Sequence, residues 1–436
     1  MFIAAMISLA DSHIVTLPDG TSEFHCTIKL PARDDVSCMR AYERDAARVL
    51  AQLGVAIVTH GLQAFDANGE PLEDGGRMMT SKGQFTETYQ ASFGPCMVPR
   101  YVYQSAAGGP TYVPLEARAR IIGLSTPLFA SSLAAKYSES SGRVVQRDLK
   151  EHHVRDIALG TIQSIVAEVG RIALRKEPHW EFVPQTPVER VATIALGMDG
   201  ACVHQCEDGW KQVMVGTIAL YDEHGERLED IAIANAPEDG KKNFFKRMDR
   251  EIERFKSHYP EALWVGVSDG AKDLRPALEK HCSQLILDFY HASEYLAAAS
   301  AGMAADAAAS GAWLQQTLHE LKHDDDAAGT ILTSMERRLQ SAAKLSGEAR
   351  HALEKACGYF ENNLDRMDYA AAQREHLPIG SGVTEAACKS LVKARLCGSG
   401  MRWEQTSMQH VLSLRGLRRS SNRWEQFWTR LDRVGY

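Results

Sequence analysis

The hydrophobic pattern between residues 187 and 291 alternates short apolar runs with polar turns. Three sequential antiparallel strands are predicted first, because apolar runs of strand length are separated by the turn sequences EDG and DEHGE. An amphipathic helix, a strand, a second helix and a last strand follow. These segments are Val191–Met198, Gln212–Tyr221, Leu228–Ala234, Lys241–His258, Leu263–Ser268, Lys272–His281 and Gln284–Leu287. In the mixed sheet that this order predicts, the first and fourth strands lie side by side.

Residues 1–114 are predicted to form a small α+β module. Met39–Leu53 has helical spacing, while the Asn-Gly and Gly-Gly pairs in ANGEPLEDGG and SAAGGPTYVP are typical of hairpin loops. Between them, FTETYQASFGPCMVPRYVYQ alternates like two strands joined at Gly94–Pro95. The apolar segment Met1–Ala10 is also interpreted as a strand rather than a signal peptide, because it is short and has no basic flank.

Residues 115–180 are predicted to be helical. Three amphipathic segments are separated by polar breaks, which is the outline of a helix-turn-helix domain with a recognition helix over Ala158–Gly170. On that helix, Thr161, Gln163 and Ser164 are polar positions suited to contacts with base edges. A small helical bundle that does not touch DNA would show the same spacing, so this alternative stays open.

The pattern changes again after His291. Residues 292–375 are rich in alanine, contain no proline and have helical spacing throughout, which predicts an all-helical insertion. The run His323–Asp326 is interpreted as a solvated turn between two of its helices. Residues 376–436 are expected to complete the domain that the insertion interrupts and to add basic C-terminal helices.

Three acidic residues carry the candidate chemistry. Asp199 directly follows the first predicted strand and Asp269 the fourth, so both are expected at one edge of the sheet. Glu385 lies where PIGSGVTEAACKSLVKAR changes from loop to helix. Three carboxylates can bind two Mg²⁺ or Mn²⁺ ions about 3.5–4 Å apart and so support in-line phosphoryl transfer. With the strand order, these acids predict a ribonuclease-H-like catalytic core.

Each acid also has a purely structural interpretation. An aspartate before glycine often forms a turn by accepting backbone N–H groups, which applies to Asp199 and Asp269. Glu385 is favoured near a helix N-terminus by the helix dipole. The joint occurrence of the three acids with the predicted strand order favours the catalytic interpretation.

The charge distribution favours a nucleic-acid partner, although the net charge of −7 by itself argues mildly against one. From His376 onward, ten Lys and Arg residues stand against four acids, a local balance of +6. Lys389, Lys393 and Arg395 follow Glu385 at near-helical spacing and are candidate phosphate contacts. The alternative is an exposed basic helix face. Trp424 and Trp428, four residues apart, are expected to pack the last helix onto the core.

The nine cysteines include no CxxC pair, which favours a reducing cytoplasm over a disulfide framework. Cys202 and Cys206 flank His204, but they supply only part of a zinc site. No apolar run in the sequence is long enough to span a bilayer, and no membrane partner is expected.

The whole pattern resembles a known family. The three acids in their contexts, the string DFYH at Asp288–His291, the helical insertion and the tail GSGMRW…LRGLRRS…RWEQFW are similar to bacterial DDE insertion-sequence transposases of the Kra type, on the Mutator and hAT side of that superfamily. The resemblance extends over nearly the whole chain and includes Tyr101–Gln104 and Pro114–Glu116. Some relatives carry N-terminal zinc-binding cysteines, which this chain lacks.

The resemblance implies roles for particular residues. Asp199, Asp269 and Glu385 would bind two catalytic Mg²⁺ (or Mn²⁺) ions, and the motif Asp-x-x-His would correspond to Asp288 and His291 as accessory residues. The implied activity is cleavage of DNA at the element ends and strand transfer into target DNA, by a homo-oligomer associated with the bacterial nucleoid. Two alternatives stay open: a ribonuclease-H-fold nuclease or resolvase, and a domesticated DNA-binding protein that has lost activity.

Overall fold

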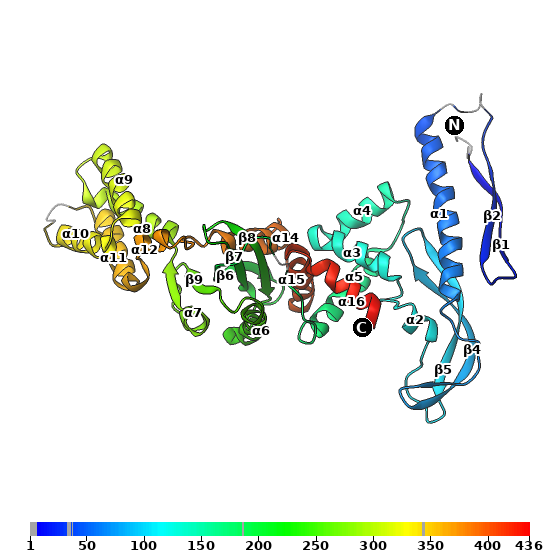
Figure 1. The fold of residues 1–436 in the computed structure, drawn as a ribbon. Coiled ribbons are helices and arrows are strands. Elements are labelled where there is room, and N and C mark those ends of the chain that lie inside the picture. The colour runs from blue at the N-terminus through cyan, green and yellow to red at the C-terminus, as the bar shows by residue number, and fades with distance from the viewer. Residues whose placement is uncertain (1–6, 33–35, 37, 185–186, 342–344) are drawn as a thin grey trace. The chain divides into compact units, whose positions relative to one another are not determined.

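The computed structural model describes residues 7–32, 36, 38–184, 187–341 and 345–436. The chain is a mixed α+β protein with two compact units, Met1–Lys176 with Phe427–Tyr436, and Glu177–Gln426 (Figure 1). The first half of the predicted strand at Met1–Ala10 lies outside the described residues, and a strand begins at Ser8.

The first unit begins with a two-stranded ribbon and a long helix. Strand β1 (Ser8–Thr16) pairs antiparallel with β2 (Ser22–Lys29), and α1 (Met39–Gln63) follows. This helix is ten residues longer than the predicted Met39–Leu53, so the predicted end was wrong. The reason is Gly54, which does not stop the helix but makes room for a neighbour. A Cβ at that position would lie 2.2 Å from the ring of Phe93.

A three-stranded antiparallel sheet completes the N-terminal module. Strands β3 (Leu72–Asp74), β4 (Arg77–Gln90) and β5 (Pro95–Ser105) are paired in that order. The register between β4 and β5 ends at Gln90 and Pro95, which confirms the hairpin predicted around Gly94–Pro95. The buried side chains of this module include Tyr89, Cys96, Val98 and Leu115, the last from the short helix α2 (Pro114–Arg118).

Three further helices follow in the first unit: α3 (Pro127–Glu139), α4 (Gly142–His152) and α5 (Leu159–Lys176). Their order agrees with the three predicted helical segments. The end of the chain also belongs to this unit. Arg120 donates hydrogen bonds to the backbone carbonyls of Asp432 at 2.7 Å and Arg433 at 2.8 Å.

The second unit is built on a five-stranded mixed sheet with the order β10-β9-β6-β7-β8. Strands β6, β7 and β8 form an antiparallel meander, whereas β9 runs parallel to β6 and β10 runs parallel to β9. The sequence therefore predicted the strand order and the adjacency of the first and fourth strands correctly. The elements are β6 (Thr193–Gln205), β7 (Gly209–Tyr221), β8 (Arg227–Asn235), β9 (Leu263–Ser268) and β10 (Gln284–Leu287).

The largest error in the predicted boundaries of this sheet concerns the end of β6. The strand expected to end at Met198 continues through Asp199 to Gln205, with Asp199 paired opposite Val215 of β7. The long partner strand explains the difference, because β7 offers backbone hydrogen bonds along the whole extension. Asp199 is therefore a residue within a strand rather than a turn residue.

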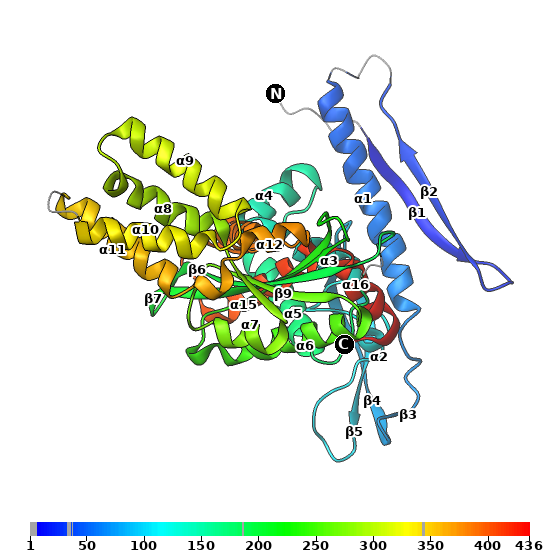
Figure 2. The same cartoon turned by 60° about the vertical axis from the view of Figure 1, so that its left-hand side comes forward.

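Helices cover both faces of the sheet (Figure 2). One face packs against α6 (Lys242–His258), which follows the short 3₁₀ turn η2 (Asp239–Lys241), and against α7 (Arg275–His281). The other face packs Ala195, Val265 and Val267 against the segment between residues 289 and 377. Burial of both faces is what the continuous apolar runs of β6 and β9 require.

In the predicted insertion, helices joined by short turns make up the described residues, 292–341 and 345–375. Its helices α8, α9, α10 and α11 lie side by side as a bundle (Figure 2). The turn predicted at His323–Asp326 lies between α9 and α10, with His323 as the last residue of α9. The helical elements are α8 (Phe289–Met303), α9 (Ala307–His323), α10 (Ala327–Ser341), α11 (Gly347–Glu361), η3 (Leu364–Arg366) and α12 (Tyr369–Arg374).

The remaining chain returns to the sheet. Helix α13 (Gly382–Ala387) passes into a π-helical segment, η4 (Cys388–Lys393), and then into α14 (Ala394–Leu396). Helices α15 (Gln405–Arg419) and α16 (Arg423–Val434) follow. Trp424 and Trp428 are buried, as expected for residues that pack the last helix.

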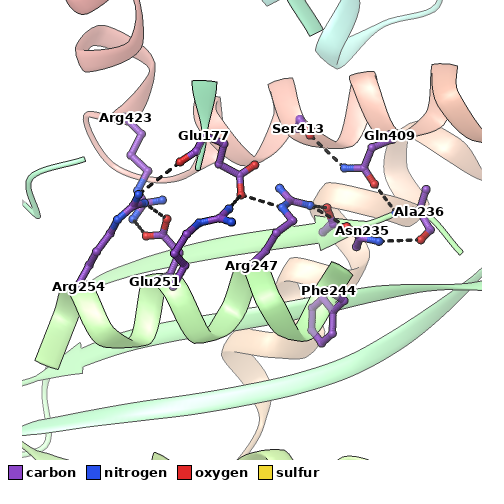
Figure 3. Close-up of polar contacts among 12 residues, drawn as sticks. Glu177, Asn235, Ala236, Phe244, Arg247, Glu251, Arg254, Gln409, Ser413 and Arg423 are labelled. Carbon is purple, nitrogen blue, oxygen red and sulfur yellow. Dashed lines mark hydrogen bonds and ion pairs between the residues drawn. The ribbon is translucent and has the colours of Figure 1, made fainter. Parts of the chain in front are cut away.

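A buried ion-pair network holds three segments of the second unit together (Figure 3). Glu177, which follows α5, accepts hydrogen bonds from Arg247 at 2.8 Å and Arg250 at 2.7 Å, both on α6. Glu251 accepts from Arg254 at 2.5 Å and from Arg423 at 2.6 Å. Burial raises the pKa of Glu177, but the neighbouring guanidinium groups outweigh it and hold that pKa below its ordinary value.

Candidate active site

Two aspartates lie at the same level of neighbouring strands. The paired register of the parallel strands β6 and β9 ends at Gly197 and Val267. Asp199 and Asp269 each follow two residues later. The two residues therefore lie at the same level of adjacent strands, which are about 4.8 Å apart where they are paired. Both side chains are half-buried.

The loop that contains Asp269 is fixed by its own turn and by the helical insertion. The Asp269 carboxylate accepts the backbone N–H of Ala271 at 3.0 Å, and its backbone carbonyl accepts the Tyr359 hydroxyl at 2.9 Å. Gly270 adopts a φ of +94°, and a Cβ there would approach the Tyr359 ring at 3.4 Å. Burial, together with the charges of Asp269 and Asp288, raises the pKa of Tyr359, so its hydroxyl stays a donor.

The Asp199 carboxylate has two protein partners. One oxygen accepts the backbone N–H of Gly200 at 2.6 Å, and the other accepts the Cys388 thiol at 3.5 Å. Burial and the adjacent charge of Asp199 raise the pKa of Cys388 to about 12, so the thiol is a neutral donor. Cys388 follows Glu385 by three residues, and the charge of Glu385 also contributes to that rise. The thiol thus connects the strand carrying Asp199 with the helix carrying Glu385.

Glu385 lies in the first turn of α13 and is held there by its neighbour in sequence. Thr384 shares a buried hydrogen bond of 2.7 Å with Thr217 of β7. The side chain of Thr384 fits directly over Gly197, where a Cβ would come within 2.0 Å of its hydroxyl oxygen. Glu385 itself is 38 % exposed and lies 3.7 Å from the Lys389 ammonium group.

Glu385 also meets the two residues of the Asp-x-x-His motif. Ligand atoms of Asp288, His291 and Glu385 all lie within 4.8 Å of one another, a spacing that could hold a metal ion. Asp288 is fully buried, while His291 is 37 % exposed and lies 3.5 Å from Glu294.

Asp288 is, however, already saturated with donors. One oxygen caps α8 by accepting the N–H groups of Tyr290 at 2.7 Å and His291 at 3.4 Å. The other accepts the backbone N–H of Ser381 at 3.1 Å and the Ser381 hydroxyl. Asp288 therefore links the segment that enters the insertion to the segment that leaves it. Of the three residues, His291 and Glu385 retain lone pairs that could bind a metal ion.

The predicted phosphate contacts near Glu385 are only partly accessible. Lys389 and Lys393 are exposed. The Arg395 side chain is instead 3 % exposed and lies over the Trp403 ring, 5.0 Å from its centroid. A buried guanidinium stacked on an indole indicates a packing role, so the structure does not support Arg395 as an accessible phosphate contact.

The predicted recognition helix corresponds to α5. Ile162, Ile165 and Val166 face its buried side, whereas Gln163 and Ser164 are exposed and Thr161 is half-buried. The exposed face is therefore polar, as a surface that reads base edges requires.

Several residues of the site were missed from the sequence: Thr217, Tyr359, Ser381 and Cys388. Only the π-helical turn that begins at Cys388 is a local anomaly of a kind often found at functional sites, and it becomes visible only in the structure.

Searches for relatives do not identify a family: no protein-family model and no curated protein matches the chain. Among the described residues, no helix combines the length and apolar character that crossing a membrane requires.

Proposed function

We propose that this chain is a DDE transposase of an insertion sequence, with a ribonuclease-H-like core that cleaves DNA at the element ends and transfers the strand to target DNA. The observation that carries the proposal is the parallel register of β6 and β9, because Asp199 and Asp269 each lie two residues beyond its last pair, Gly197 and Val267. The sheet order β10-β9-β6-β7-β8, with an all-helical insertion after β10, supports it as well.

The donor set suits Mg²⁺ or Mn²⁺. A carboxylate offers about four lone-pair sites, and the hydrogen bonds described above use two sites on Asp199 and one on Asp269. Glu385, whose ligand atoms lie within 4.8 Å of those of Asp288 and His291, is proposed as the third donor with the hard oxygens that these cations prefer. Two bound ions would supply an activated water and stabilisation of the attacking and leaving oxygens.

The protein's own contribution is positioning. The neutral Cys388 thiol donates to the Asp199 carboxylate and keeps it oriented. The Tyr359 hydroxyl donates to the Asp269 carbonyl and fixes the backbone there. Thr384 sets the position of Glu385 through Thr217. A site whose ligands are held by such partners needs little rearrangement when charge develops on the scissile phosphate.

DNA recognition is assigned to two surfaces. The exposed face of α5 with Thr161, Gln163 and Ser164 would read the element ends in the major groove. Lys389 and Lys393, next to Glu385, would contact the phosphates of the cleaved strand. A homo-oligomer would then bring two element ends together.

The catalytic assignment is tested by conservative substitutions in the full chain. Asp199→Asn, Asp269→Asn and Glu385→Gln should each abolish Mg²⁺-dependent cleavage of a donor DNA while end binding persists, because each removes a ligand charge and almost no volume. Asp222→Asn is the matched control and should cleave normally. Asp222 accepts the backbone N–H groups of His224 and Glu226 in the turn after β7, and its neighbour Tyr221 pairs with Thr193 at the opposite end of β6. Cleavage retained by any one of the first three variants would remove that residue from the site.

The same assay separates the alternatives. A ribonuclease-H-fold nuclease or resolvase would cut branched DNA or hybrid without preference for element ends. A domesticated DNA-binding protein would bind without cutting. A transposase should produce 3′-hydroxyl ends that join to target DNA.

A further inference from the structure

The N-terminal ribbon has little apolar packing to stabilise it. Strands β1 and β2 form a sheet of two strands, and nearly all of their side chains are exposed. An isolated two-stranded hairpin is at best marginally stable in water. Strand β1 also contacts α1, and cross-strand interactions can add to the stability of this ribbon.

Two histidines stand directly opposite one another on the ribbon. His13 of β1 pairs with His25 of β2, and their rings are stacked with centroids 5.4 Å apart and planes inclined by 6°. Asp11 and Glu23 lie two residues from them on the same strands, so the alternation of side chains keeps them on the same face. Two imidazoles and two carboxylates are thus collected on one face.

Each imidazole is oriented by its own carboxylate. His13 Nδ1 lies 3.3 Å from an Asp11 oxygen, and His25 Nε2 lies 2.9 Å from a Glu23 oxygen. In the neutral tautomer that donates its ring N–H to the carboxylate, the other ring nitrogen carries the free lone pair; this is Nε2 of His13 and Nδ1 of His25. Metal-binding histidines commonly donate their other ring N–H to a carboxylate in the same way.

We propose that His13 and His25 form a binding site for a divalent transition metal of the zinc type, with Asp11 and Glu23 as the orienting carboxylates. Imidazole nitrogen selects Zn²⁺, Cu²⁺ or Ni²⁺ over Mg²⁺, so the site is chemically distinct from the carboxylates around Asp199. The two carboxylates neutralise the charge of the ion. All four side chains are between 52 % and 67 % exposed, so the imidazoles can turn toward one ion and water can complete the coordination. The bound ion would link β1 to β2 and stabilise the ribbon.

The test is calorimetric titration of the full chain with Zn²⁺ at pH 7.5 in excess Mg²⁺. His13→Ala and His25→Ala should each remove one equivalent of bound zinc. His224→Ala is the matched control, because His224 is also exposed and lies 3.7 Å from a carboxylate, that of Glu223, but belongs to a turn with no histidine opposite. Asp11→Asn and Glu23→Gln should weaken binding by about 10-fold. Equal zinc stoichiometry in the wild type and in His13→Ala would overturn the proposal.

A second readout follows the ribbon itself. Zinc should slow amide hydrogen exchange in Ser8–Lys29 of the wild type and leave exchange in His25→Ala unchanged, because the ion acts as a cross-strand link. Asp199→Asn should retain this response, so the site can fail or succeed independently of the proposed transposase activity. Slowed exchange that persists in both histidine variants would show that zinc acts elsewhere.

Discussion

Thr384 and Thr217 share a buried hydrogen bond of 2.7 Å between α13 and β7, although they are 167 residues apart in the chain. Thr384 directly precedes Glu385, so this bond fixes the start of the helix that presents the third candidate metal ligand. The close approach is possible because the position beneath it is a glycine, Gly197 of β6. Two strands and the candidate catalytic helix therefore meet at one point.

Gly197→Ala should impair cleavage without touching any ligand. A Cβ would lie 2.0 Å from Thr384 Oγ1 and 2.9 Å from Thr217 Oγ1, so the helix must shift away from β6. We expect a stability loss of about 1–3 kcal/mol in urea unfolding, and strongly reduced Mg²⁺-dependent cleavage. Gly329→Ala on α10 is the control: a Cβ there meets nothing within 4 Å, and stability should stay equal or rise by at most about 1 kcal/mol. Full activity in Gly197→Ala would show that the position of α13 does not limit the reaction.

Asp288→Asn should behave as a structural variant. The amide would present a donor to the Ser381 N–H and hydroxyl, which now both donate to the Asp288 carboxylate. We expect a loss of about 2–3 kcal/mol, as for hydrogen bonds to a buried charged group, together with faster amide exchange at the start of α8. The exposed acid Asp325, which pairs with Arg374 at 2.8 Å, serves as the control and should lose at most about 1 kcal/mol on change to Asn. Wild-type stability combined with lost cleavage would instead identify Asp288 as a metal ligand.

The parts of the fold that depend on local sequence patterns could be predicted from the sequence. Apolar runs of strand length and their turns predicted the meander β6-β7-β8, and the sheet order followed from the alternation of strand and helix. The boundaries at Leu53 and Met198 were wrong because they depended on distant partners. Gly54 is covered by the Phe93 ring, and β6 is extended by pairing with β7.

In the candidate site, too, the features set by local sequence pattern could be predicted and those set by distant partners could not. Asp199, Asp269 and Glu385 were recognisable because each stands at a distinctive point of the pattern. The contacts of Cys388 with Asp199 and of Tyr359 with the Asp269 carbonyl join residues 189 and 90 positions apart. No periodicity in a single sequence encodes such pairings, so the groups that position the acids could not be predicted.

Glu404 provides a pH-dependent test of helix capping. Its carboxylate accepts the backbone N–H groups of Thr406 at 2.8 Å and Ser407 at 2.7 Å at the start of α15, and these bonds lower its pKa to about 2. Because the folded pKa lies below the ordinary value of 4.5, the stabilisation is complete above pH of about 4.5 and is lost as the pH falls toward 2. Glu404→Ala should therefore cost about 0.5–2 kcal/mol at pH 7 and progressively less at pH 4 and 3. A difference between variant and wild type that does not change with pH would contradict the capping role.

The buried pair Glu251–Arg423 should contribute strongly to the second unit, because Glu251 is 1 % and Arg423 10 % exposed at a separation of 2.6 Å. Glu251→Gln removes the charge that both Arg254 and Arg423 face, and we expect a loss of about 3–5 kcal/mol in urea unfolding. Arg423→Met should cost less, because Glu251 keeps Arg254 at 2.5 Å.

The double variant Glu251→Gln with Arg423→Met measures the interaction free energy between these two residues. Once Glu251 is neutral, Arg423 has lost its hydrogen-bonded counter-charge, so its removal should add less and the combined loss should fall short of the sum by about 0.5–3 kcal/mol. The exposed pair Arg350–Glu354 on α11, 4.0 Å apart, is the control, and Glu354→Gln should change stability by at most about 0.5 kcal/mol. Strict additivity of the two buried substitutions would mean that Glu251 and Arg423 stabilise the unit through separate contacts. Glu251 would then act through Arg254, and Arg423 through the Phe182 ring, whose centroid lies 5.1 Å from the guanidinium carbon of Arg423.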